Sequence, residues 1–139
     1  MNTQKRVLLF DDDTKFLVAI CDDIRFSLIA RNLQLDVVQD LEQLDLELRQ
    51  SGEIVLAIID LWIIDKRHNR PDHEAGDRAL KRLRARWPAA YVIVLSSHLD
   101  PDARLRLADF KQLMLANKPI PTAELLSIMD KVLDTIHPR

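Results

Sequence analysis

The sequence has 139 residues, of which 47% are hydrophobic, and this suits one domain with its own core. Its 20 basic and 22 acidic residues nearly cancel, which argues against a polyanion or a membrane surface as the main partner. We therefore expect a single domain over residues 1–139, with no appended DNA-binding or catalytic domain and no direct contact with nucleic acid or membrane.

The sequence also bears on the cellular compartment. No apolar run has the length of a membrane-spanning helix, and the first six residues lead into a strand-like run, not a secretory signal. Cys21 is the only cysteine, so no intramolecular disulfide can form. These features predict a cytoplasmic protein.

Five apolar, strand-like runs alternate with five stretches of helical periodicity. The predicted strands cover residues 7–10, 35–38, 54–60, 91–95 and 113–116. The first predicted helix is capped by Thr14, and the second is marked by residues 41–48 and closed by Gly52. The third is marked by residues 79–87 and stopped by Pro88. The fourth starts near residues 100–101, and the fifth covers residues 122–136. This alternation predicts an α/β fold, with a parallel sheet covered on both faces by helices.

Polar side chains stand where four of these strands end. The run at 54–60 is rich in β-branched residues and stops on Asp60, as expected of a strand buried on both faces. Three other strands end on Asp11, Ser96 and Lys118. In open α/β sheets, ligands bind outside the carboxyl ends of the strands, so the sequence predicts a functional site at this edge.

The predicted site is rich in carboxylates. If Asp11, Asp12 and Asp60 meet at one edge, their mutual repulsion favours a bound cation, and oxygen ligands of this kind suit Mg²⁺. Asp60 could then act as a nucleophile towards phosphorus, with Lys118 and Ser96 contacting the phosphoryl oxygens. With only two glycines, the chain lacks the Gly-rich phosphate loops of the common nucleotide-binding folds.

Four segments carry a family resemblance: residues 7–13 (VLLFDDD), 58–60 (IID), 92–97 (VIVLSS) and 117–119 (NKP). In this order, each at a strand end, they resemble the receiver domain of two-component response regulators, of the stand-alone, CheY-like type. The resemblance spans nearly the whole chain. It implies a flavodoxin-like fold, a (βα)5 sandwich whose five-stranded parallel sheet has the order 2-1-3-4-5.

The resemblance also implies a role for each site residue. Asp60 would accept a phosphoryl group from a sensor histidine kinase or a phosphotransfer protein, and the Lys118–Pro119 peptide bond would be cis. The implied Mg²⁺ ligands are Asp11, Asp12, Asp60 and the backbone carbonyl of Trp62, while Ser96 is the implied switching hydroxyl and Lys118 the implied phosphate contact.

Phosphorylation would alter a protein-binding surface that acts on a separate downstream effector protein. We expect a signalling domain rather than an enzyme, with self-phosphorylation and self-dephosphorylation as its only reactions. A homodimer is left open. Trp62 and His98 hold positions that flank the attacking water in receivers, which predicts slow self-dephosphorylation.

The sequence departs from the receiver pattern at three places. Leu115 replaces the usual aromatic switch residue, and Ile64 replaces the usual proline after the phosphoacceptor. The customary glycine arrives only at Gly76, which predicts a longer loop over residues 65–74. Because this loop would border the site, we expect it to contribute to partner choice.

Two other functions stay open. One is an interaction module with a receiver-like fold that is never phosphorylated, which Leu115 and Ile64 favour. The other is a phosphohydrolase of the haloacid dehalogenase type, although Lys15 stands where that motif needs Thr or Val. At single residues, Asp13 is either a further metal ligand or a helix-start acid, and His68 and His73 are more readily explained as part of a solvated loop than as zinc ligands.

Overall fold

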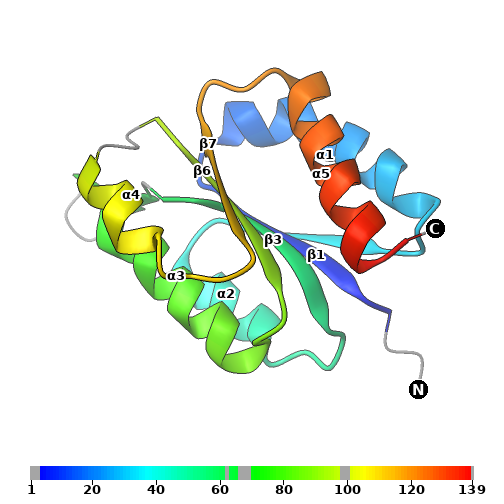
Figure 1. Cartoon of the computed structure of the whole chain (residues 1–139), viewed down its shortest axis with the longest axis horizontal. Coiled ribbons are helices and arrows are strands. Elements are labelled where there is room, and N and C mark those ends of the chain that lie inside the picture. Colours follow the sequence, from blue (N-terminus) through cyan, green and yellow to red (C-terminus); the bar gives the residue numbers. More distant parts are fainter. Residues whose placement is uncertain (1–3, 62, 66–69, 98–100, 139) are drawn as a thin grey trace.

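The computed structural model describes residues 4–61, 63–65, 70–97 and 101–138. A five-stranded parallel sheet forms its centre (Figure 1). The strands lie in the order β2-β1-β3-β6-β7, and every neighbouring pair is parallel. Their bounds are β1 Arg6–Phe10, β2 Gln34–Val38, β3 Ile54–Asp60, β6 Tyr91–Ser96 and β7 Leu113–Asn117. Numbered within this sheet alone, the order is 2-1-3-4-5, which confirms the predicted flavodoxin-like fold.

Helices cover both faces of this sheet. Helices α1 (Thr14–Ile29) and α5 (Thr122–Ile136) lie on one face, and α2 (Leu41–Leu48), α3 (His73–Arg86) and α4 (Pro101–Leu107) lie on the other (Figure 1). Alternate residues of a strand point to opposite faces, so each strand supplies two hydrophobic clusters. In β1, Leu8 and Phe10 pack towards α2 and α3, while Val7 and Leu9 pack towards α1 and α5. Within the described part of the chain, no helix combines the length and apolar character needed to cross a membrane.

Two predicted helix signals act differently from expectation. The α1 cap is Asp13, not Thr14, because the Asp13 carboxylate accepts hydrogen bonds from the backbone N–H groups of Lys15 and Phe16. Helix α2 ends at Leu48, four residues before Gly52. No glycine has a positive φ in the described residues; a Cβ at Gly52 would lie 2.6 Å from the Gln4 carbonyl oxygen, so close approach explains this glycine.

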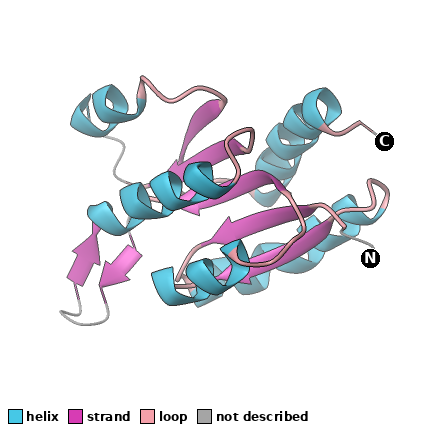
Figure 2. Cartoon of the chain, turned by 90° about the horizontal axis from the view of Figure 1, so that it is seen from below, coloured by secondary structure: helices cyan, strands magenta, loops and turns pink. Residues whose placement is uncertain are grey.

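Two short strands follow β3 in a stretch where the sequence predicts a loop. Residues 65–74 were expected to form a loop, but β4 (Ile63–Asp65) and β5 (Arg70–Asp72) pair as an antiparallel hairpin, and α3 already begins at His73 (Figure 2). The loop prediction was therefore wrong at both ends. Strands of three residues within a charged stretch carry no alternating apolar pattern, so the sequence offered no signal for this hairpin.

Gly76 lets α3 pass close to the chain where it leaves β3. A Cβ at this position would lie 2.5 Å from the Leu61 carbonyl oxygen and 2.7 Å from the Leu61 Cα. Helix α3 thus crosses directly over the backbone that leaves β3, and only glycine leaves room for this approach.

Candidate functional site

The strand ends gather the predicted residues at one edge of the sheet. Asp60 is the last residue of β3, and Asp11 follows β1, whose final residue Phe10 is paired with Ile59. On the other side of Asp60, Ser96 ends β6, and Lys118 follows β7. Parallel pairing therefore places four polar side chains from four strands at the same carboxyl edge.

Three carboxylates form the centre of this edge. One ligand oxygen each from Asp11, Asp12 and Asp60 lies within 4.8 Å of the other two. Asp11 and Asp60 are buried and Asp12 is half-buried, so water screens their repulsion poorly. The acid cluster that the sequence predicts is therefore present in the structure.

Lys118 brings one positive charge into the cluster. Its Nζ donates to Asp11 Oδ2 at 2.6 Å and to Asp60 Oδ2 at 3.4 Å. The same Nζ lies 4.3 Å from the centre of the Phe16 ring, which adds a cation–π contact from the first turn of α1. Sequence reasoning missed Phe16, because its apolar position marks it only as part of a helix face.

The site shifts the pKa values of both partners. Burial raises the pKa of the Asp11 carboxyl and the charge of Asp12 raises it further, although Lys118 and the Asp13 N–H oppose both effects. Burial alone would lower the pKa of Lys118, but its hydrogen bond to Asp11 and the charge of Asp60 outweigh this, so the pKa is raised. Lys118 therefore stays protonated, and one ammonium group faces three acids.

This donor set fits a hard divalent cation. Carboxylate oxygens within a few ångströms of one another, with an excess of negative charge, match the ligands that Mg²⁺ takes in proteins. Asp11, Asp12 and Asp60 are the side chains that would hold the ion. Trp62, whose backbone carbonyl was expected as a further ligand, lies outside the described residues.

Ser96 lies beside this cluster on β6. Its side chain is buried, and its backbone carbonyl accepts a hydrogen bond of 3.0 Å from the Lys118 N–H, which ties the ends of β6 and β7 together. The Lys118–Pro119 peptide bond is cis, as the resemblance implied. Asp13, by contrast, caps α1. His68 and His98 lie outside the described residues.

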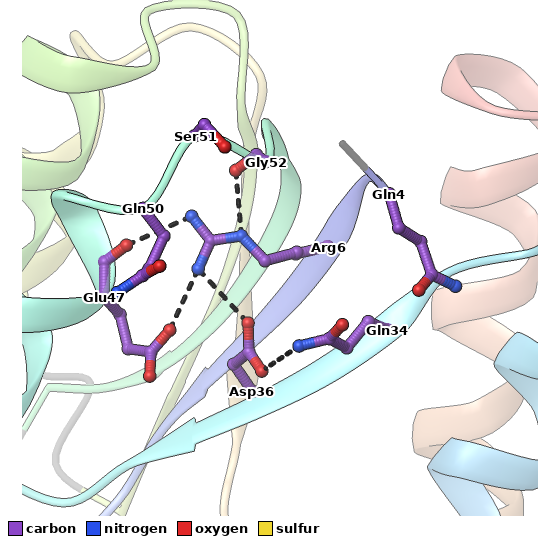
Figure 3. Close-up of a pocket in the computed structure, with 8 residues that line it drawn as sticks. All are labelled: Gln4, Arg6, Gln34, Asp36, Glu47, Gln50, Ser51 and Gly52. Carbon is purple, nitrogen blue, oxygen red and sulfur yellow. Dashed lines mark hydrogen bonds and ion pairs between the residues drawn. The ribbon is translucent and has the colours of Figure 1, made fainter. Parts of the chain in front are cut away.

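A polar hollow of about 390 Å³ lies at the opposite, amino edge of the sheet (Figure 3). At its centre the buried guanidinium of Arg6 donates to the carboxylates of Asp36 and Glu47 and to the carbonyl oxygens of Glu47 and Gly52. These partners come from β2, from α2 and from the turn before β3. We call this arrangement the Arg6 clamp and assign it a structural role, because the guanidinium hydrogen bonds are made to oxygens of the protein itself.

Comparisons with known proteins agree with the fold. No family model and no curated protein matches the sequence. Among solved structures, a signal receiver domain of a putative Luxo repressor protein from Vibrio parahaemolyticus shares 19% identity and a TM-score of 0.69, over 96% of this chain and 92% of that one. A response regulator from Thermotoga maritima shares 18% identity and a TM-score of 0.68, over 94% and 98% of the two chains.

A structure described as an adenylate cyclase from Rhodopirellula baltica shares 15% identity and a TM-score of 0.73, over 96% of this chain and 92% of that one. At such identities the likeness shows the fold alone. This chain therefore has the CheY-like receiver fold over nearly its whole length.

Proposed function

We propose that this chain is a response-regulator receiver whose Asp60 accepts a phosphoryl group from a histidine kinase or a phosphotransfer protein. The observation that carries this proposal is the contact of the Lys118 ammonium group with both Asp11 and Asp60, inside a cluster of three carboxylates. The receiver fold supports it, since the cluster lies at the edge where such folds bind ligands.

The proposed chemistry is a single displacement at phosphorus. An Asp60 carboxylate oxygen attacks the phosphorus of a phosphohistidine, the P–N bond breaks, and the imidazole leaves with its electron pair, which leaves an acyl phosphate on Asp60. Lys118, held by Asp11 and Phe16, would pair with a phosphoryl oxygen. When bound by the three acids, Mg²⁺ supplies charge neutralisation for the transferred oxygens.

Phosphorylation would then act on the surface near β6 and β7. It adds a charge of about −1.5 to −2 and three acceptor oxygens, to one of which the Ser96 hydroxyl would donate. Leu115, in place of the usual aromatic, packs with Phe110 against the cluster that contains Leu107 of α4. We infer that the change reaches a separate effector protein through this shared hydrophobic cluster, without an aromatic side chain that changes rotamer.

The hairpin β4–β5 is proposed to contribute to the choice of kinase. It follows Leu61 directly after the Asp60 strand and leads into α3, so it borders the proposed site in the chain. Shortening it should change the rate of phosphotransfer from a kinase and leave the rate with acetyl phosphate unchanged. Equal effects on both donors, or no effect on either, would contradict this role.

Small phosphodonors test the proposed function directly. With acetyl phosphate and Mg²⁺, the intact mass of the wild-type chain should rise by one phosphoryl group, whereas Asp60→Asn should gain none. Asp13→Asn is the matched control, because asparagine keeps an oxygen for the α1 cap and the proposed site stays complete.

Three results would contradict the proposal. No mass gain in the wild type would favour a phosphorylation-independent interaction module. A gain that survives in Asp60→Asn would place the acceptor elsewhere. Steady turnover of a generic phosphate ester, with no labelled protein, would favour a phosphohydrolase of the haloacid dehalogenase type.

A further inference from the structure

Helix α1 presents large apolar side chains to solvent. Val18, Phe26 and Ile29 are 83%, 79% and 72% exposed, although the opposite face of the same helix packs into the core. Single exposed apolar residues are common on protein surfaces, but three on one helix indicate a contact surface.

Two opposite charges lie between these apolar residues. In an α-helix Val18, Asp22, Arg25 and Ile29 fall within a sector of about 60°, with Phe26 on its flank. Asp22 and Arg25 are exposed, and no ion pair joins either of them to another residue in the described part of the chain. The stripe therefore reads apolar, acidic, basic, apolar along the helix.

The stripe on one copy of α1 therefore matches the same stripe on a second copy that runs in the opposite direction. The pair Val18 and Ile29 and the pair Asp22 and Arg25 share one midpoint, between Asp23 and Ile24. When two copies of α1 lie antiparallel about a two-fold axis at that midpoint, Val18 of each copy faces Ile29 of the other, and each Asp22 comes within reach of an Arg25. A surface made for an unrelated partner has no need of this symmetry.

We propose that this α1 stripe, made of Val18, Asp22, Arg25, Phe26 and Ile29, binds a second copy of the chain in an antiparallel helix pair. In this contact the apolar residues at each end supply buried surface, and the two opposite-charge pairs beside the axis fix the register of the helices. One helix pair buries little area, so the dimer forms and separates reversibly with concentration. The proposal does not depend on phosphorylation of Asp60.

Sedimentation velocity of the full chain over a range of concentrations tests this dimer. The average mass of the wild type should rise with concentration from that of one chain towards that of two. Asp22→Arg and Arg25→Asp should each weaken the dimer at least about tenfold, because each brings like charges together across the axis. An equimolar mixture of the two variants should recover dimers, since each copy then supplies the charge that the other lacks.

Leu46→Asp is the control for a general loss of surface apolarity, because Leu46 is exposed on α2, away from the stripe. It should leave the monomer–dimer equilibrium unchanged. The proposal is overturned if the wild type stays monomeric at all concentrations, if neither charge reversal weakens the dimer, or if the mixture fails to recover it. Binding of a different helical protein to the stripe of a monomeric chain would also overturn it.

Discussion

The ammonium nitrogen of Lys118 lies 2.6 Å from a carboxylate oxygen of Asp11, across 107 positions of the chain. Asp11 is buried, and the same nitrogen contacts Asp60 at 3.4 Å. The ends of β1, β3 and β7 are thus joined by one buried charge cluster. The net negative charge of this cluster should affect the stability of the protein, its binding of Mg²⁺ and its response to pH.

Removing one acid from the cluster should stabilise the metal-free protein. The charge of Asp12 raises the pKa of Asp11, which means that the two carboxylates repel one another. Asp12→Asn relieves this repulsion and should raise the melting temperature by about 2–4 °C in the presence of a chelator. Asp13→Asn, in which the neighbouring acid outside the cluster is replaced, should change it by less than about 1 °C. An unchanged or lower value in Asp12→Asn would show that the repulsion is already screened.

Mg²⁺ should stabilise the folded protein, and this stabilisation should require the same acids whose repulsion destabilises the metal-free protein. At ten times its Kd, an ion that binds only the folded state adds about 1.4 kcal/mol to the free energy of unfolding. Thermal unfolding of the wild type should follow this dependence on Mg²⁺ concentration. Asp12→Asn and Asp60→Asn should lose most of it. A stabilisation that is the same in all three proteins would place the ion elsewhere.

The stability of the metal-free protein should depend on pH through Asp11. Because the pKa of this carboxyl is raised above its ordinary value of 3.8, the folded state holds the proton to higher pH than the unfolded chain does. The Asp11 contribution to the free energy of unfolding therefore decreases as pH rises from about 3.8 through the folded pKa. This contribution is measured by urea unfolding in the presence of a chelator, as the difference in free energy of unfolding between the wild type and Asp11→Asn. The difference between the two proteins should change with pH in this window, and a constant difference would contradict the raised pKa.

Gly76 should not tolerate a methyl group. In an ordinary helix Gly→Ala adds about 1 kcal/mol of stability, but here the new Cβ would meet the Leu61 backbone at 2.5 Å. We expect Gly76→Ala to lower the free energy of unfolding by about 1–3 kcal/mol in urea. The reverse change at an exposed position of the same helix, Ala85→Gly, calibrates helix propensity and should cost about 1 kcal/mol. A stabilised Gly76→Ala would mean that α3 does not cross this backbone closely.

The Arg6 clamp should stabilise the amino edge of the sheet (Figure 3). Arg6→Met leaves Asp36 and Glu47 without their shared guanidinium and should cost about 3 kcal/mol in chemical unfolding. Lys5→Met is the control, because the Lys5 side chain forms an exposed ion pair with Glu53, and it should change stability by less than about 0.5 kcal/mol. An equal loss of unfolding free energy in the two variants would show that the Arg6 clamp does not stabilise this edge.

The sheet and the acid cluster were predictable because each depends on a repeated local signal. The run at 54–60 fixes a buried strand, and the polar residues that end four strands must share an edge once the strands are parallel. Phe16 and the Asp13 cap were not predictable in this way. The first acts through a contact with Lys118, about a hundred residues away, and the second depends on which of two neighbouring polar residues starts the helix. The hairpin was missed because its three-residue strands have no pattern of their own.

The most direct test of the account is to locate the phosphoryl group itself. After reaction with acetyl phosphate and Mg²⁺, borohydride reduces an acyl phosphate on aspartate to homoserine, and tandem mass spectrometry of the digested chain identifies the residue. We expect homoserine at position 60 in the wild type, with its yield reduced when Mg²⁺ is withheld. Homoserine at another aspartate, or none at any position in a protein that folds normally, would contradict it.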